Sequence, residues 1–292
     1  MPPLATLFDR SAAPPLPLPA AVAARYGGPL GFPAPTGRPF LFSNFVTTLD
    51  GVVSFDLPGR AHAGLISRSN DDDRYVLGLL RACADAVVVG AGTLRVERAG
   101  RWTPEGAYPD AAADFAALRR ALGKPARPTT VFVTASGRLD LDAAVFASTD
   151  PVAILTTKQG ARLLEWPAGT VPGPVIDRRV PVLVMDADAP TGRDIVAALA
   201  ANPEWRTILT EGGPTLLGHF LRDGVLDEMF QTLAPQIAGR SAGERRLALV
   251  EGTAFAPEAA PWSRLLSVKR SGDGLLFLRY ALGAQDRPSS AS

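Results

Sequence analysis

The 292-residue chain carries 30 Lys and Arg against 29 Asp and Glu, and 47% of its residues are hydrophobic, enough to fill a sizeable core. The formal net charge of +1 gives no broad basic field for nucleic acid or a membrane surface. Cys83 is the only cysteine, which excludes an intrachain disulfide and a cysteine-rich zinc site, and we expect no metal. Because no signal-like N-terminus or membrane-length apolar run is apparent, we expect a cytoplasmic protein.

The predicted elements begin after a stretch rich in proline and alanine, residues 1–37, which we expect to be an extended arm or disordered. The alternation of apolar and polar residues then predicts strands and helices in turn. We expect strands at 38–48, 52–55, 85–89, 129–134, 152–157, 181–185, 207–210, 227–234, 264–270 and 275–282. We expect helices over 69–83, 110–122, 191–201 and 214–223.

Helix signals mark the ends of two of these helices. Ser69 and Asp72 have the spacing of a capping box, and we expect the acidic run at 70–73 to face solvent at the helix start. Pro214 suits a first helical turn, and Gly224 suits a left-handed C-cap.

This order of elements predicts an α/β fold, with a mixed, mostly parallel sheet flanked by helices. The turn at 271–274 joins the last two strands into an antiparallel hairpin at one edge of the sheet. We expect a single domain over 38–283, after the arm at 1–37 and before a disordered tail at 284–292.

Two glycine turns follow predicted strands, Gly90-Ala91-Gly92-Thr93 and Glu211-Gly212-Gly213-Pro214-Thr215. In open α/β sheets ligands bind beyond the carboxyl ends of strands, and the free N–H groups of a helix start attract phosphate. Together the turns can hold a pyrophosphate-containing cofactor, although tight turns without a ligand have the same sequence. The first turn is a weak dinucleotide motif, because Arg95 stands where its third glycine is expected.

Several single polar residues have both a structural and a functional interpretation. Asp50, before Gly51, suits a turn or a site. Glu211 can reach a ligand or cap the helix that follows it. Arg81 can cap a helix C-terminus or hold a substrate phosphate. His62 and His219 lack metal-ligand partners at suitable spacing, and we interpret both as structural.

Four segments together resemble the riboflavin-biosynthesis pyrimidine reductases, which share the dihydrofolate reductase fold. They are SNFVTTLDG at 43–51, LLRACADAVVVGAGT at 79–93, VTASGRL at 133–139, and the EGGPTL, LDE and LAP motifs within 209–239. The resemblance covers residues 38–282. It implies a dihydrofolate reductase-like fold, a homodimer, and NADPH-dependent reduction of the ribosyl side chain of a phosphorylated ribosyl-pyrimidine to ribityl.

The resemblance also implies roles for individual residues. Asn44, Asp50 and Glu211 would be catalytic, and Arg81 and Arg95 would bind substrate together with Glu211. Ser136, with Arg138, would favour NADPH over NADH at the adenosine 2′-phosphate. The NADPH site would comprise Val46, Thr48, Gly90, Ala91, Gly92, Thr93, Glu97, Ser136, Arg138, Thr156, Gly212, Gly213, Pro214, Thr215 and Leu216.

One segment departs from the family pattern. The GAGT motif is usually followed by Val-Arg-x-Asp-x-Pro-x-Leu, whereas residues 94–102 read LRVERAGRW. Because this segment contacts substrate in the family, two alternatives remain: a reductase of another heterocycle such as a dihydropterin, or a nucleotide-binding protein without catalysis. Residues 1–37 contain no Cys or His, so we expect no zinc deaminase there.

Overall fold

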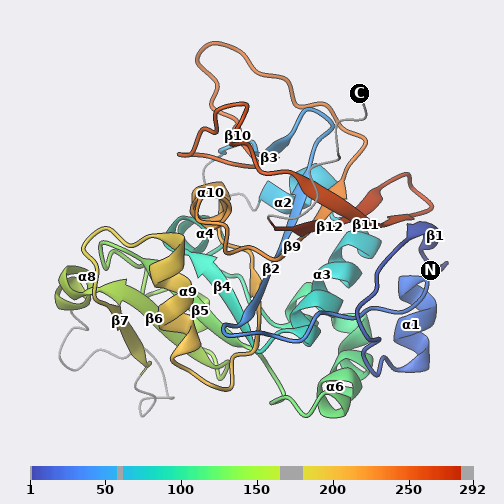
Figure 1. Cartoon of the computed structure of the whole chain (residues 1–292), viewed down its shortest axis with the longest axis horizontal. Helices are drawn as coiled ribbons and strands as arrows, with labels where there is room; N and C mark the ends of the chain where they lie inside the picture. The colour runs from blue at the N-terminus through green and yellow to red at the C-terminus, as the bar shows by residue number, and fades with distance from the viewer. Residues whose placement is uncertain (1, 58–61, 165–179, 284–292) are drawn as a thin grey trace.

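The computed structural model describes residues 2–57, 62–164 and 180–283 (Figure 1). The tail expected to be disordered, 284–292, lies outside the described residues. Most of the described strands form one ten-stranded sheet in the order β1-β11-β12-β9-β2-β8-β4-β5-β6-β7, and β3 and β10 form a separate pair. The strands are β1 Ala5–Asp9, β2 Phe40–Thr47, β3 Val52–Ser54, β4 Ala86–Gly90, β5 Thr129–Thr134, β6 Val152–Thr157, β7 Val182–Met185, β8 Thr207–Thr210, β9 Glu228–Leu233, β10 Leu247–Ala248, β11 Ser263–Arg270 and β12 Leu276–Leu282.

The helices lie between strands along the chain. They are α1 Ala20–Tyr26, α2 His62–Ser67, α3 Asp71–Cys83, α4 Ala91–Val96, α5 Pro104–Ala107, α6 Ala112–Ala121, α7 Ala144–Ala147, α8 Lys158–Leu163, α9 Gly192–Ala200 and α10 Pro214–Arg222, with a 3₁₀ turn at Pro109–Ala111. No helix in the described ranges has the length and apolar character needed to cross a membrane.

The sheet has a core on each face, because successive side chains of its central strands point to opposite sides. In β4, Val87 and Val89 join the core that includes α3 and α6, whereas Val88 joins the core that includes α9 and α10. All three valines are fully buried, which explains why β4 reads as a continuous apolar run. The strands from β9 through β7 run parallel, and β12, β11 and β1 add an antiparallel edge. The predicted fold class is confirmed.

The start of α3 differs from the prediction. Asn70 is the cap: its Oδ1 accepts the N–H groups of Asp72 at 2.9 Å and Asp73 at 3.2 Å, whereas Ser69 adopts a positive φ of 50°. The expectation that this acidic run faces solvent was wrong for two of its members, since Asp72 and Asp73 are only 4% and 8% exposed. Burial raises the pKa of both carboxyl groups.

The arm contains a strand and a helix that its weak periodicity did not predict. Strand β1 lies at the end of the sheet beside β11 and pairs antiparallel with it (Figure 1). Helix α1 buries Val22 and Tyr26 in the core that includes residues of α3. Lys269 of β11 donates to the Thr6 hydroxyl at 2.7 Å and to the Gly27 carbonyl at 3.0 Å. These tertiary contacts, which local sequence patterns do not encode, order the arm.

Candidate active site

A cavity of about 1490 Å³ opens at the carboxyl ends of β4 and β8, and both glycine turns line it. The turns lie side by side in its wall: a Cβ added to Gly90 would lie 3.8 Å from the backbone nitrogen of Gly213. A Cβ on Gly213 would lie 3.5 Å from the Thr93 hydroxyl. Parallel pairing of β4 with β8 brings these distant segments together, because it aligns their carboxyl ends.

The helices that begin at these turns lack side-chain caps. Helix α4 starts after Gly90 and α10 after Gly213, with Pro214 in the first turn, and neither glycine can supply a capping oxygen. By contrast, the side chain of Thr191 caps α9. The first N–H groups of a helix have no partner within it, so an uncapped start has free donors for an anion.

Arg81 and Glu211 form a nearly buried ion pair at the cavity wall. Arg81, in the last turn of α3, donates Nε to Oε1 of Glu211 at 2.7 Å and Nη2 to Oε2 at 2.6 Å. Its Nη1 donates to the carbonyls of Arg101 at 3.0 Å and Thr103 at 3.2 Å. Through these bonds the guanidinium positions the Glu211 carboxylate at the cavity wall.

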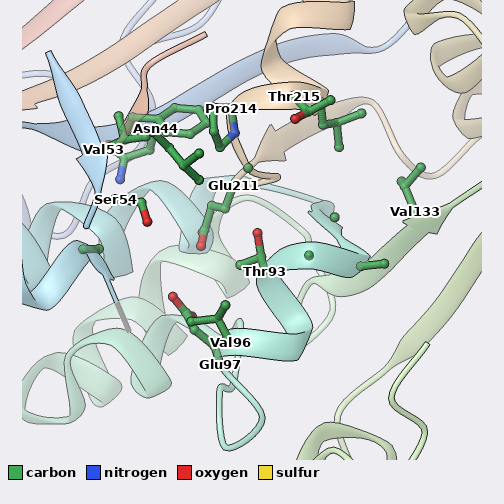
Figure 2. Close-up of a pocket in the computed structure, with 18 of the residues that line it drawn as sticks. Asn44, Val53, Ser54, Thr93, Val96, Glu97, Val133, Glu211, Pro214 and Thr215 are labelled. Atoms are coloured by element: carbon green, nitrogen blue, oxygen red, sulfur yellow. The ribbon is translucent and has the colours of Figure 1, made fainter. Parts of the chain in front are cut away.

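Glu97, the C-cap residue of α4, is a second carboxyl in the cavity. Figure 2 shows its oxygens directed to the same region as those of Glu211 and the hydroxyl of Thr93. Burial raises the pKa of Glu97, the nearby charge of Glu211 raises it further, and Arg81 lowers it. Two carboxyl groups therefore share one region, but only Glu211 has an arginine partner.

Two residues after β2, Thr48 and Asp50, connect two loops and lie outside the cavity lining. Thr48 donates to Asp50 at 2.6 Å, and Asp50 also accepts the N–H groups of Ala238 at 3.0 Å and Gly239 at 2.8 Å. These bonds, the Thr48 bond foremost, lower the pKa of Asp50 to about 2. Asp50 thus joins the turn after β2 to the loop after β9, and neither residue lines the cavity.

Four residues expected at the cofactor also lie outside the cavity lining. Ser136 and Arg138 are exposed beyond the carboxyl end of β5, next to Ala135, which does line it. Thr156 is fully buried. Gly212 packs against Leu216: a Cβ there would lie 2.4 Å from Cδ2 of the leucine, whose side chain would have to move.

The other residues that the resemblance assigned to the site do line this cavity. They are Asn44, Val46, Arg81, Gly90, Ala91, Gly92, Thr93, Arg95, Glu97, Glu211, Gly213, Pro214, Thr215 and Leu216.

A family model of the RibD C-terminal domain matches residues 39–277. The chain belongs to this family. Among solved structures, it is similar to a pyrimidine reductase-like protein of Corynebacterium diphtheriae, with 23% identity and a TM-score of 0.64 over 85% of this chain and 93% of that one.

Two further structures of the RibD type are similar over part of their length. RibD of Acinetobacter baumannii is 20% identical with a TM-score of 0.60, over 85% of this chain and 59% of that one. A diaminohydroxyphosphoribosylaminopyrimidine deaminase/5-amino-6-(5-phosphoribosylamino)uracil reductase of Thermotoga maritima is 19% identical with a TM-score of 0.55, over 84% of this chain and 57% of that one. At these identities the likeness establishes a shared fold. Comparison with curated protein sequences finds no match.

This member of the RibD C-terminal domain family has a cavity residue that its sequence did not suggest. Asp73 on α3 lines the cavity and is 8% exposed. The signal was present: Asp73 precedes Val76 and Leu80 at spacings of three and seven, on the buried face of the helix. Because Asp73 belongs to a run of acidic residues, we expected it to face solvent despite this spacing.

Proposed function

We propose that this chain is an NADPH-dependent reductase that converts the ribosyl side chain of 5-amino-6-(5-phosphoribosylamino)uracil, or of its close pyrimidine analogue, to ribityl. Family membership supports a pyrimidine reductase. The observation that supports the cofactor most directly is the pair of uncapped helix starts facing one cavity.

The residues around the two turns fit a dinucleotide. Neither Gly90 nor Gly213 has a side chain, so a diphosphate would approach the backbone directly at the first turns of α4 and α10. Asn44 of β2 lies near Pro214 (Figure 2), and Val46 of the same strand also lines the cavity; both would contact the nicotinamide. When bound, reduced nicotinamide supplies the hydride, and the protein supplies position and charge.

The substrate would lie between Glu211 and the segment after α4. Glu211, fixed by Arg81, can accept hydrogen bonds from sugar hydroxyls. Arg95 is exposed, lines the cavity and has no ion-pair partner in the described part of the chain, so it is free to bind the substrate phosphate.

Turnover of defined substrates tests this proposal. Purified protein should oxidise NADPH with the ribosyl-pyrimidine, yield the ribityl product by mass spectrometry, and leave dihydrofolate unreduced under the same conditions. Reduction of dihydrofolate alone would identify a pterin-type reductase. Binding of NADPH with oxidation by neither substrate would indicate a nucleotide-binding protein without catalysis.

A further inference from the structure

The cavity extends past the glycine turns to a second end, next to β3 and the start of α3. In Figure 2, Val53 and Ser54 of β3 lie on one side of the cavity, and Val133 of β5 lies on the other. With a diphosphate at the glycine turns and the nicotinamide beside Asn44, the end next to β3 is left for the substrate.

Arg245 and Asp56 form an ion pair at this end, and both residues line the cavity. Nε of Arg245 lies 3.6 Å from Oδ2 of Asp56, too far for a hydrogen bond, and the two side chains are 73% and 39% exposed. An exposed pair of this kind contributes little free energy, because water competes for both charges. The Arg245 guanidinium can therefore leave Asp56 at small cost.

The chain around Arg245 is attached to β3, although the Arg245 side chain is not. Nη1 of Arg246 donates to the Phe55 carbonyl at 3.2 Å, and Nη2 donates to Glu244 at 2.8 Å. Strand β10, which begins at Leu247, pairs antiparallel with β3. These contacts hold the loop after β9 beside the cavity, while the Arg245 guanidinium can change its partner.

The other charged groups at this end make Arg245 the cation available to an anion. Asp56 and Asp73 both line this end, so an anion there needs a cation beside it. Arg74 of α3 also lines it, but its Nε donates to a backbone carbonyl of α5 at 3.1 Å. Arg245 makes no hydrogen bond within the described part of the chain.

We propose that Arg245 binds the substrate phosphate, and that Asp56 competes with this phosphate for the guanidinium. The inference rests on the proposed function, and it gives the substrate site a cation, besides Arg95, that the sequence did not suggest. One guanidinium can donate two charge-assisted hydrogen bonds to a phosphate, which therefore displaces a carboxylate that accepts none. A substrate without the phosphate lacks this means of displacing Asp56, so the pair selects phosphorylated substrates.

Steady-state kinetics with the phosphorylated ribosyl-pyrimidine at saturating NADPH test both residues. Arg245→Met should raise the substrate KM about tenfold, the loss expected for one hydrogen-bonded charge, and Arg245→Lys should recover part of it. Asp56→Asn should lower this KM about two- to fivefold, because it removes the competing charge. The double variant Arg245→Met/Asp56→Asn should match Arg245→Met. If Asp56→Asn lowers KM equally with and without Arg245, Asp56 repels the phosphate directly and the competition is wrong.

Two controls separate phosphate binding from a change in the loop. The dephosphorylated ribosyl-pyrimidine, measured as a competitive inhibitor, should bind Arg245→Met and wild type equally, and the KM for NADPH should not change. Arg240 is exposed on the same loop and lies outside the cavity lining, so Arg240→Met should match wild type. Equal weakening of both forms of the substrate by Arg245→Met would mean that Arg245 supports the loop and does not bind phosphate.

The outcomes separate the two proposals. If the wild type fails to reduce the ribosyl-pyrimidine, the proposed function is wrong, and this inference with it. If the wild type is active and Arg245→Met leaves the substrate KM unchanged, the role of Arg245 is wrong, while the proposed function stands.

Discussion

Arg81 is buried at the end of α3 and also positions a carboxylate of the candidate active site. It ends the apolar face of α3, is 6% exposed, and makes its hydrogen bonds to Glu211 and to two backbone carbonyls. The sequence suggested that Arg81 and Glu211 lie near a ligand, and both line the cavity. It did not suggest that they bind each other, because that contact joins residues far apart in the chain.

Breaking this pair should destabilise the protein. Arg81→Met leaves the Glu211 carboxylate desolvated without a partner, and should reduce the free energy of unfolding by about 3 kcal/mol. The double variant Arg81→Met/Glu211→Leu should lose less, since no unpaired charge remains. Urea denaturation of the two single variants and the double variant measures the coupling. Additive losses would mean that the pair contributes no coupling energy.

At the scale of elements, local signals predicted the strands and the longer helices well. The capping box of Thr191 and Asp194 marked the start of α9, and the apolar run at 207–210 marked β8. The short helices α2, α4, α5, α7 and α8 were missed, because four to six residues give too little periodicity. Strand β1 and helix α1 were missed because pairing with β11 and burial against α3 order them.

Buried Arg279 of β12 forms hydrogen bonds both to a sheet strand and to the N-terminal arm. It donates to Glu228 at 2.7 Å and to the Gly31 carbonyl at 2.6 Å. Burial raises the pKa of Glu228 to about 7, above its unfolded value near 4.5, so the folded state holds this proton more tightly. This contribution to stability is complete below the unfolded pKa and disappears as pH rises through about 7.

We therefore expect the stability of the wild type to decline between pH 5 and pH 8, with a smaller decline in Glu228→Gln, which keeps an oxygen acceptor for Arg279. Urea midpoints at unit pH intervals measure this difference. Equal pH slopes in the two proteins would show that Glu228 is not the titrating group.

At the scale of the molecule, the site follows from the order of the strands. Strand β8 lies between β2 and β4 in the middle of the sheet. Segments near Asn44, Gly90 and Glu211 therefore meet at the carboxyl ends of these three strands. The sequence predicted a mostly parallel sheet and suggested that the two glycine turns act together. It did not predict that Asp50 and Thr48 would join two loops outside the cavity, because their bonds depend on the path of the chain after β9.

The central claim is that the glycine turns at 90–93 and 212–215 bind one diphosphate between them. A crystal structure of the protein with NADPH tests this most directly. We predict that the diphosphate oxygens accept hydrogen bonds from backbone N–H groups at the starts of both α4 and α10, with the nicotinamide ring on the side of Asn44 and Glu211. A diphosphate held by only one turn, or bound outside this cavity, would contradict the account.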